Sequence, residues 1–429
     1  MNWLYRILIN LAIPFGLIGL IVRGFKNPAY WQRWGERFGF ANEAVKKAGP
    51  FDLWIHAVSV GEARAAAPLV QEFLVKQPGA NILVTTTTPT GSAMVSMQLR
   101  DTVQHCYFPY DLAWAMQRFA NLVAAQTVLI METEIWPNMI AAVKRSGSRL
   151  IYTNVRLSER SYTKYAKFPK WVKTTLSQVD HFAVQGVLDR KHLELLGVSP
   201  DRITETGSIK FDVSIAPSLR ESAEVLRRQL GQDRLIWIAG STRENEESKV
   251  LAVYKRLKAD FPSLLLLLVP RHPERFDYIS RKVQRRELNC VRRTEQPEMS
   301  ALPVDTDVYL GDTMGELSLM YAASDLAFVG GSLEPLGGQN ILEPCALGVP
   351  VVFGPHMFNF PDISRWTIKE GAGRMVHNET ELLQVIAELL GNPSLRDEMG
   401  NKGVRFIEAH KGALDKNSRL IENLTKSTV

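Results

Sequence analysis

Two acidic residues in the first half of the chain have a type and position suited to chemistry. In "HAVSVGEARAAAPLV" (residues 56–70), Glu62 follows a short apolar run and a glycine, where an amphipathic helical pattern begins. Glu132 follows another apolar run in "LIMETEIWPN" (129–138), and Glu134 comes two residues later. Open α/β folds place their active residues at the carboxyl edge of the sheet. We therefore predict that Glu62 and Glu132 lie at that edge, and that Glu134 caps the helix that follows.

A lysine at the close of the same half could complete this site. Lys210 lies in "ETGSIKFD" (205–212), where the strand-like series ends. Two acids and a lysine that converge would support proton transfer and charge stabilisation. A structural alternative stays open for Glu62, because an acid in the first turn of a helix also complements the helix dipole.

The second half offers a phosphate site. Four loops each follow a strand-like run: "AGSTRENEE" (239–247), "VPRHPER" (269–275), "GDTMGEL" (311–317) and "GGQNILEPCALGVPVV" (337–352). Helices that begin there would present free N–H groups and a positive dipole end to an anion. Arg271 adds a bidentate phosphate donor, and Glu343 could accept both hydroxyls of a ribose. These loops predict a site for a nucleotide monophosphate group.

Other sites are not supported by the sequence. It contains no glycine-rich dinucleotide or P-loop motif, no H-E-x-x-H, and no clustered cysteine and histidine set. Asp305 and Asp307 precede the expected strand 308–310 and so lie at the amino edge of the sheet, whereas a metal site is expected at the carboxyl edge. We expect no metal and no cofactor. Three scattered cysteines suit a reducing compartment.

Strand-like runs alternate with helical patterns along most of the chain, which predicts parallel sheets covered on both faces. The expected strands are residues 51–58, 82–87, 105–108, 127–131, 150–155 and 182–185, then 235–239, 264–269, 308–310, 326–329 and 351–353. We predict two Rossmann-like, doubly wound domains that face a central cleft. Their expected bounds are 1–24 for an N-terminal anchor, 25–212 for the first domain, 213–233 for a linker, and 234–429 for the second domain with its closing helices.

Composition agrees with this organisation. The chain has 429 residues, enough for two domains with full cores, and 22% of them are charged. A net charge of +6 permits an anionic partner, but no nucleic-acid-binding motif is present, so we expect no nucleic acid partner.

The N-terminus is strongly apolar. "ILINLAIPFGLIGLIV" (7–22) lacks charge, and "RGFKNPAYWQRWGERFG" (23–39) then interleaves cations with aromatic residues. This order favours a membrane anchor with a cytoplasmic body over a buried helix. The segment 160–175 carries five cations and several aromatic residues. It is either a solvated helix with core aromatics or a surface for anionic lipid.

Taken together, the motifs resemble one family. "SVGE", "METEIWPN", "TGSIKFD", "VPRHPER", "TMGEL" and "NILEP" occur in the order and spacing of the bacterial 3-deoxy-D-manno-octulosonic acid (Kdo) transferases. The resemblance implies a GT-B type fold, CMP-Kdo as donor and a lipid A precursor (lipid IVA) as acceptor. It also implies an inverting, metal-independent reaction in lipopolysaccharide core biosynthesis, on the cytoplasmic side of the bacterial inner membrane.

The resemblance also assigns roles by position. It places the general base on Glu62 and the stabilisation of the transition state on Glu132 and Lys210. We expect the neighbouring helix N-terminus to keep Glu62 ionised. CMP contacts fall on Pro270, Arg271, Met314, Gly315, Glu316, Asn340, Ile341, Leu342 and Glu343. Ser241 and Thr242 are further phosphate neighbours.

Two other functions remain compatible with the sequence. A sugar-nucleotide 2-epimerase shares the two-domain architecture but has no need of the N-terminal anchor. A non-catalytic lipid-binding protein of the membrane surface would show no turnover of CMP-Kdo and no sensitivity to a change at Glu62.

Overall fold

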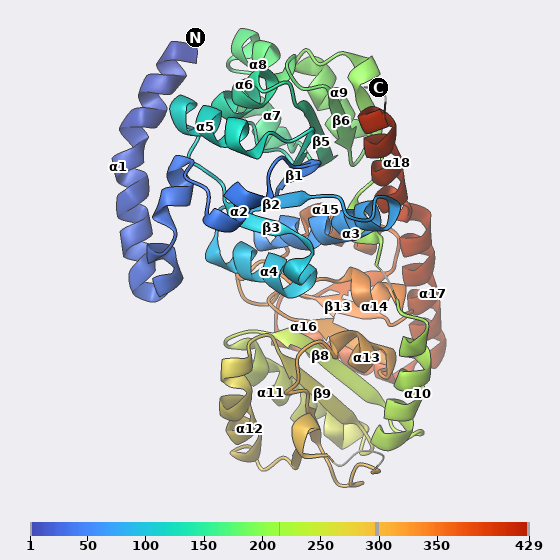
Figure 1. Ribbon diagram of the computed structural model, residues 1–429. Coiled ribbons are helices and arrows are strands. Elements are labelled where there is room, and N and C mark those ends of the chain that lie inside the picture. Colours follow the sequence, from blue (N-terminus) through green and yellow to red (C-terminus); the bar gives the residue numbers. More distant parts are fainter. Residues whose placement is uncertain (1, 214, 297–299, 427–429) are drawn as a thin grey trace. The chain divides into compact units, whose positions relative to one another are not determined.

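Two parallel sheets organise the protein (Figure 1). The computed structural model describes residues 2–213, 215–296 and 300–426, and within these residues each sheet has seven strands. The chain divides into unit 1, Met1–Asp212 with Lys411–Val429, and unit 2, Val213–His410. Each unit contains one of the sheets, and every strand pairing in both sheets is parallel.

The sheet of unit 1 has the order β3-β2-β1-β4-β5-β6-β7. Its strands are β1 (Leu53–His56), β2 (Ile82–Thr86), β3 (Gln104–Tyr107), β4 (Thr127–Met131), β5 (Arg149–Val155), β6 (His181–Val184) and β7 (Ile203–Glu205). The helices are α1 (Asn2–Lys26), α2 (Glu43–Ala48), α3 (Val60–Lys76), α4 (Pro89–Leu99), α5 (Ala113–Val123), α6 (Pro137–Arg145), α7 (Glu159–Tyr165), α8 (Pro169–Leu176), α9 (Val187–Leu195) and α18 (Ala413–Lys426).

The sheet of unit 2 has the order β10-β11-β9-β8-β12-β13-β14. Its strands are β8 (Ile236–Thr242), β9 (Leu265–Pro270), β10 (Cys290–Arg292), β11 (Val308–Leu310), β12 (Leu326–Val329), β13 (Val351–Phe353) and β14 (Gly373–Met375). The helices are α10 (Ser218–Leu230), α11 (Glu246–Asp260), α12 (Phe276–Gln284), α13 (Leu317–Ala322), α14 (Leu342–Ala346), α15 (Pro361–Lys369), α16 (Glu379–Gly391) and α17 (Pro393–His410).

The central strands are buried along their whole length. Every residue of β1, β4, β8 and β9 is buried, as expected for parallel strands covered by helices on both faces. The strand order reverses between β1 and β4 in unit 1 and between β8 and β12 in unit 2. Open α/β sheets bind ligands at the carboxyl ends of strands beside such a reversal. The loops after these four strands are therefore the places to search for function.

The predicted strands largely agree with the structure, and 127–131, 308–310, 326–329 and 351–353 match their strands residue for residue. The expected strands do not include β7, β10 and β14. Each of these has three residues and lies at the edge of its sheet. An edge strand is covered less completely, so its sequence carries a weaker apolar signal.

The segment 213–233, expected to be a linker, differs from the prediction. It contains α10, whose Ala223, Leu226 and Leu230 are buried within unit 2. Arg227 of α10 donates hydrogen bonds to the carboxylate of Asp325 at 3.0 Å and to the carbonyl of Arg234 at 2.7 Å. A polar, charged helix resembles a linker in sequence because only a narrow stripe of it is apolar.

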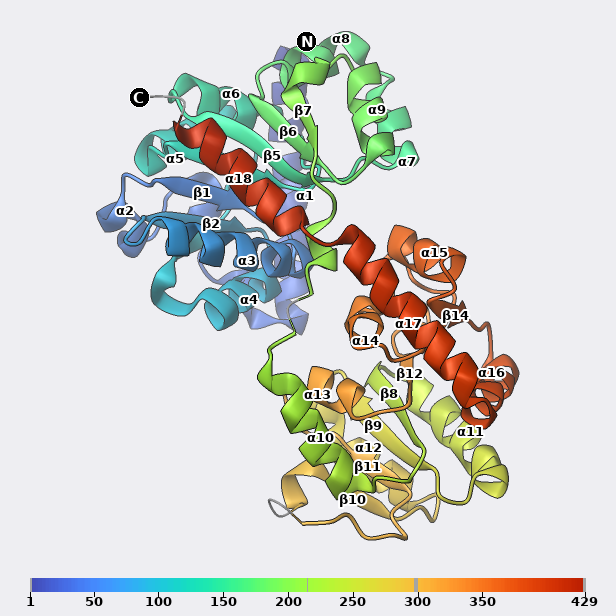
Figure 2. The same cartoon turned by 90° about the vertical axis from the view of Figure 1, so that its right-hand side faces the viewer.

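The end of the chain also departs from the predicted bounds, because α18 belongs to unit 1. The carboxylate of Asp212 accepts the N–H groups of Gly412 and Leu414, both at 2.6 Å. The side chain of Asn417, itself fully buried, accepts a hydrogen bond from Thr153 of β5 at 2.7 Å. Figure 2 shows α18 across the face of the sheet of unit 1. The sequence of a closing helix does not reveal which sheet it covers.

A single buried carboxylate fixes the carboxyl edge of unit 2. Glu246, the first residue of α11, is completely buried. Its two oxygens accept the N–H groups of Arg243 at 2.9 Å, Gly331 at 2.6 Å, Ser332 at 2.9 Å and Leu333 at 2.9 Å. Arg243 follows β8 and the other three follow β12, so Glu246 joins the two loops that flank the strand reversal.

This arrangement predicts a large loss of stability when the carboxylate is removed. Glu246→Ala leaves four N–H groups without their acceptor, three of them buried, and each buried group costs about 1–3 kcal/mol. We expect the free energy of unfolding to fall by at least about 3 kcal/mol, measured by calorimetry.

Glu274→Ala is the matched control, because that side chain is 74% exposed. It should change the free energy of unfolding by less than about 0.5 kcal/mol. Equal effects of the two substitutions would show that Glu246 does not hold the loops.

Candidate functional site

Glu62 lies at the start of α3 and is held there by its own turn. Ser59 caps the helix by accepting the N–H of Glu62 at 3.4 Å. The carboxylate of Glu62 reaches back to accept the Val58 N–H at 2.7 Å and the Ser59 hydroxyl at 3.1 Å. Ser59 and Glu62 thus have the spacing of a capping box, with the glutamate bonded one residue further back than usual. These bonds fix the direction of the side chain at the carboxyl end of β1.

The environment of Glu62 favours its protonated form. Burial raises the pKa of this carboxyl to about 8, and the negative charge of Glu132 contributes further. The hydrogen bonds from Val58 and Ser59 act in the opposite direction without compensating. The expectation that the helix N-terminus keeps Glu62 ionised at neutral pH is therefore wrong. Only 7% of the residue is exposed, and the lost hydration outweighs the helix dipole.

Glu132 and Lys210 form an ion pair in the same unit. The Nζ of Lys210 lies 3.3 Å from Oε1 of Glu132, and each side chain is about a quarter exposed. Glu132 adopts a left-handed backbone conformation (φ 57°) directly after β4, and its N–H donates to the carbonyl of Thr153 at 2.9 Å. Such a conformation costs a non-glycine residue on the order of 1–3 kcal/mol and is concentrated at functional sites.

Asn154, which is not among the residues predicted for the site, orients the segment that carries Lys210. It is fully buried in β5 with a left-handed φ of 54°. Its side-chain oxygen accepts the N–H of Ile209, the residue before Lys210, at 3.1 Å. Asparagine tolerates this conformation better than most residues, and that was the available signal. Thr153 and Asn154 together position both members of the ion pair.

Glu134 does not cap the next helix as predicted. Trp136 is the N-cap residue of α6, and its side chain makes no capping hydrogen bond. The carboxylate of Asp111 instead accepts the N–H groups of Asn138 at 3.1 Å and Met139 at 2.7 Å. Burial raises the pKa of the Glu134 carboxyl, and Glu132 contributes. Unit 1 therefore gathers three acids at the carboxyl edge of its sheet, one of them paired with Lys210.

In unit 2, the predicted donor residues follow four neighbouring strands. Pro270 ends β9, and the N–H of Arg271 donates to the carbonyl of Thr242 at the end of β8 at 3.0 Å. Since β8, β9, β11 and β12 are parallel neighbours, their following loops meet at one edge. Ser241 adopts a left-handed φ of 54°, and the Thr242 hydroxyl is buried without a hydrogen-bond partner in the described part of the chain.

The loop after β11 contains Met314, Gly315 and Glu316. Met314 is 61% exposed, and Gly315 has a φ of 88°, which suits glycine. Two nitrogens of Arg293 lie 3.1 and 3.2 Å from the Glu316 carboxylate and hold its pKa below the usual value. The carboxylate of Glu316 is thus occupied by the protein itself.

Asn340 to Glu343 form the start of α14. The Asn340 side chain accepts the Leu342 N–H at 3.1 Å and donates to Glu343 at 3.0 Å. Ile341 and Leu342 are completely buried, so they can face a ligand only through their backbone. Glu343 keeps a partly exposed carboxylate that is oriented by Asn340.

No group of three potential metal ligands occurs among residues 2–213, 215–296 and 300–426. Asp307 serves the fold, since its carboxylate lies 2.9 Å from the Nζ of Lys258.

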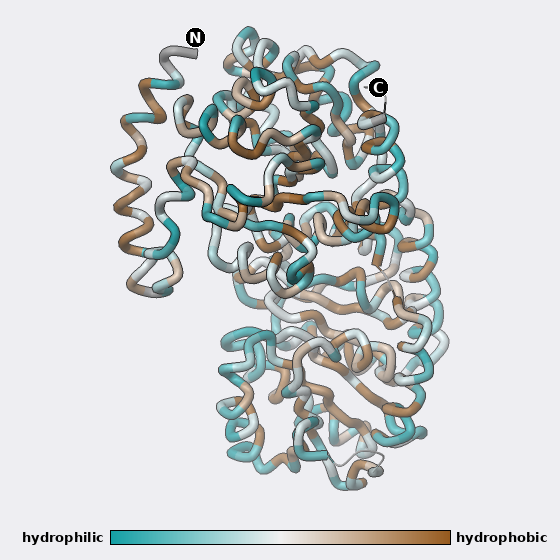
Figure 3. The backbone as a smooth tube through the Cα atoms, viewed as in Figure 1, coloured by the Kyte–Doolittle hydropathy of each residue, from teal (hydrophilic) through white to brown (hydrophobic). Residues whose placement is uncertain are grey.

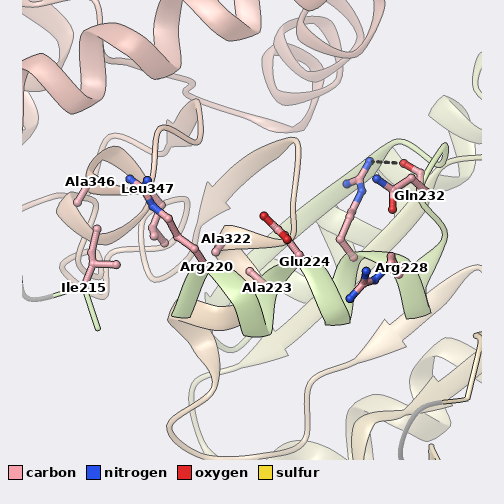
Figure 4. A pocket seen from close by; sticks show the side chains of 10 residues that line it. Ile215, Arg220, Ala223, Glu224, Arg228, Gln232, Ala322, Ala346 and Leu347 are labelled. Carbon is pink, nitrogen blue, oxygen red and sulfur yellow. Dashed lines mark hydrogen bonds between the residues drawn. The ribbon is translucent and has the colours of Figure 1, made fainter. Parts of the chain in front are cut away.

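Unit 2 also contains a cavity of about 430 Å³, and Figure 4 shows the side chains that line it. Its wall includes Arg220, Glu224 and Arg228 of α10 and the ends of α13 and α14. Helix C-termini in a doubly wound fold lie at the edge opposite the carboxyl ends of the strands. None of the predicted site residues lines this cavity.

Helix α1 has the length and composition to cross a membrane. It contacts the rest of unit 1 through Tyr5, whose hydroxyl donates to Asp111 at 2.7 Å, and its Leu20 is buried. Much of its apolar surface faces outward, including Leu11 (64% exposed) and Phe15 (75% exposed). Figure 3 shows hydrophobic residues along the length of this helix.

The raised pKa of Glu62 predicts a pH-dependent stability. The folded state binds this proton more tightly than the unfolded state, whose pKa is near 4.5. The stabilisation is complete below pH 4.5 and is lost as pH rises through 8, at about 1.4 kcal/mol per pKa unit.

Glu62→Gln should remove this loss, because glutamine has no proton to release. The melting temperature of the wild type should fall relative to that of the variant between about pH 5 and 8. Glu43→Gln, at a side chain 74% exposed, should follow the wild type. Parallel curves for wild type and Glu62→Gln would contradict the burial effect.

A family model and two similar proteins carry the same family name. Residues 32–213 match the family model described as 3-deoxy-D-manno-octulosonic-acid transferase (kdotransferase). The chain is 39% identical to the 3-deoxy-D-manno-octulosonic acid transferase of Haemophilus influenzae over 97% of this chain and 96% of that protein. It is 35% identical to the enzyme of the same name from Bordetella pertussis, over 88% of each chain.

Solved structures show the same fold at much lower identity. UDP-GlcNAc 2-epimerase from Neisseria meningitidis bound to UDP-GlcNAc aligns with a TM-score of 0.55 and 13% identity, over 86% of this chain and 98% of that one. This likeness concerns the architecture of two doubly wound units and not the reaction.

Proposed function

We propose a donor, an acceptor and a catalytic base for this chain, which belongs to the Kdo transferase family and is a glycosyltransferase with a GT-B type fold. The donor is CMP-Kdo and the acceptor is a hydroxyl group of the lipid A precursor. Glu62 is the base. The observation that supports it most directly is a buried, oriented carboxylate beside the Glu132–Lys210 ion pair.

The acceptor hydroxyl must lose its proton as the new glycosidic bond forms. An ionised Glu62 takes that proton, and its hydrogen bonds to Val58 and Ser59 hold the carboxylate in place. Glu132 and Lys210 form a polar pair that stabilises charge near the reacting atoms. Attack on the face opposite the departing CMP inverts the anomeric carbon.

CMP departs carrying a phosphate, which needs compensating positive charge. Arg271 supplies a guanidinium beside the end of β9, and the backbone around Gly315 and Asn340 supplies N–H groups. Glu343, oriented by Asn340, accepts the ribose hydroxyls. This set compensates the phosphate without a metal ion.

The central experiment weighs the lipid product. Purified protein is incubated with CMP-Kdo, lipid A precursor and excess chelator, and the lipid is examined by mass spectrometry. We expect added Kdo, with kcat/KM rising with pH toward a plateau above about 8, because Glu62 must be ionised. In Glu62→Gln, kcat should fall by about 10²–10⁴-fold.

An epimerised sugar nucleotide without a lipid product would favour the epimerase alternative. Near-wild-type turnover in Glu62→Gln would remove the base assignment. Activity that returns only with Mg²⁺ would contradict a metal-free mechanism.

Arg271→Ala should weaken donor binding. A charge-assisted hydrogen bond to phosphate contributes roughly 1.5–3 kcal/mol, so the Kd for CMP should rise by about 10- to 100-fold in calorimetric titration. Arg285→Ala, at an exposed arginine of the same unit, should leave the Kd unchanged. An unchanged Kd in Arg271→Ala would exclude this residue from the phosphate site.

We further propose that α1 anchors the enzyme to the cytoplasmic face of the inner membrane. Its exposed apolar side chains support this, as does the contact of Tyr5 with Trp171 of α8, whose ring centroids are 5.6 Å apart. Helices α7 and α8 carry the basic segment 160–175, and Phe168 between them is 55% exposed. An apolar helix beside a basic, aromatic surface suits an anionic bilayer and a phosphorylated lipid.

The exposed face of α1 can be tested without deleting the helix. Leu11→Glu combined with Phe15→Glu should reduce co-sedimentation with anionic phospholipid vesicles by at least about tenfold, because charges in apolar membrane segments are costly. Val75→Glu replaces an equally exposed apolar residue of α3 and should sediment like the wild type. Unchanged sedimentation of the α1 variant, with unchanged CMP affinity, would show that this face does not contact the membrane.

A further inference from the structure

Arg243, at the carboxyl end of the central strand β8, has an unused donor. Its Nε is shielded from solvent, and no hydrogen-bond acceptor faces it in the part of the chain that the structure describes. The carboxylate of Glu244 forms an ion pair with this Nε at 3.6 Å, which is beyond hydrogen-bonding distance. Glu244 lies closer to Arg275, at 3.0 Å. A buried guanidinium N–H without an acceptor is costly, and such groups call for an explanation.

The backbone of Arg243 is fixed in place. Its N–H donates to the buried Glu246 at 2.9 Å. The aliphatic stem lies beside Gly331, where a Cβ would come within 3.6 Å of the Arg243 Cγ and 3.2 Å of the Gln339 amide. Gly331 also has a φ of 68°, so a side chain is disfavoured there for two reasons. The backbone and the start of the side chain of Arg243 are therefore held in place by the protein itself.

Arg243 shares its sheet edge with the predicted phosphate ligand. Thr242 and Pro270 are register partners in β8 and β9, so Arg243 and Arg271 follow adjacent strand ends. Burial lowers the pKa of His272, and the positive charges of Arg243 and Arg271 lower it further. The charges of both guanidinium groups thus reach the same imidazole, where Glu274 and Glu244 act in the opposite direction.

We infer that Arg243 binds the carboxylate of the donor sugar while Arg271 holds the phosphate. This inference rests on the proposed function, in which the donor is a nucleotide-linked sugar acid with two anionic groups. Two planar guanidinium forks at adjacent strand ends match those two groups in number and chemistry. A neutral sugar nucleotide would offer this guanidinium no carboxylate to bind, so Arg243 determines specificity for an acidic sugar.

The test compares the whole donor with its nucleotide part. Steady-state kinetics give KM for CMP-Kdo, and competitive inhibition gives Ki for CMP, in full-length wild type, Arg243→Met, Arg243→Lys and Arg271→Ala. We expect KM to rise on the order of 10- to 100-fold in Arg243→Met while Ki for CMP stays within about twofold. Arg243→Lys keeps the charge and should recover part of the loss. Arg271→Ala should raise both constants.

Each other outcome overturns the assignment. Equal increases of KM and Ki in Arg243→Met would place Arg243 at the phosphate, and no increase in either would exclude it from the site. If Arg243→Met does not fold, Arg243→Lys alone decides, since a raised KM with unchanged Ki is still expected. Failure of the proposed function is recognised separately, because the wild-type enzyme would then not turn over CMP-Kdo at all.

Discussion

The carboxylate of Glu246 is the constraint on which the carboxyl edge of unit 2 depends. The strand order reverses between the neighbouring strands β8 and β12, and the sheet pairing itself does not fix the loops that follow them. The buried carboxylate of Glu246 fixes both loops, because it accepts four of their backbone N–H groups. It sets the backbone of Arg243 directly. It also sets the glycine-rich loop after β12, from which the chain continues to Asn340 and Glu343.

In unit 1, residues with strained backbone conformations, and not one shared acceptor, define the carboxyl edge of the sheet. Glu132 and Asn154 both take left-handed conformations at the ends of neighbouring strands, and both are held by hydrogen bonds that cross to other segments. Strain of this kind persists only when surrounding contacts over-determine it. The helix α18 supplies some of those contacts through Asn417 and Thr153, so the end of the chain supports a site formed much earlier in the sequence.

Much of this could be predicted from the sequence, and the exceptions have physical causes. The alternation of apolar runs with helical patterns predicted the sheets. The positions of Glu132 and Lys210 along the chain predicted that they converge, and the two residues form an ion pair. The cap of α6 by Asp111 was missed because its acceptor lies 26 residues before the helix, so no local spacing marks it. The placement of α18 in unit 1 depends on tertiary hydrogen bonds from Asp212 that no pattern within the helix displays.

The raised pKa of Glu62 suits the role of base that we propose for it. A carboxylate with an ordinary pKa is fully ionised at neutral pH but is a weak acceptor for the proton of an alcohol. Burial raises the pKa to about 8, which leaves about one tenth of the molecules ionised at pH 7 and costs about 1.4 kcal/mol. The same change makes the ionised carboxylate a stronger base, and general base catalysis is most effective when the pKa lies near the working pH. The hydrogen bonds from Val58 and Ser59 limit the shift, so Glu62 combines an oriented carboxylate with a usable ionised fraction.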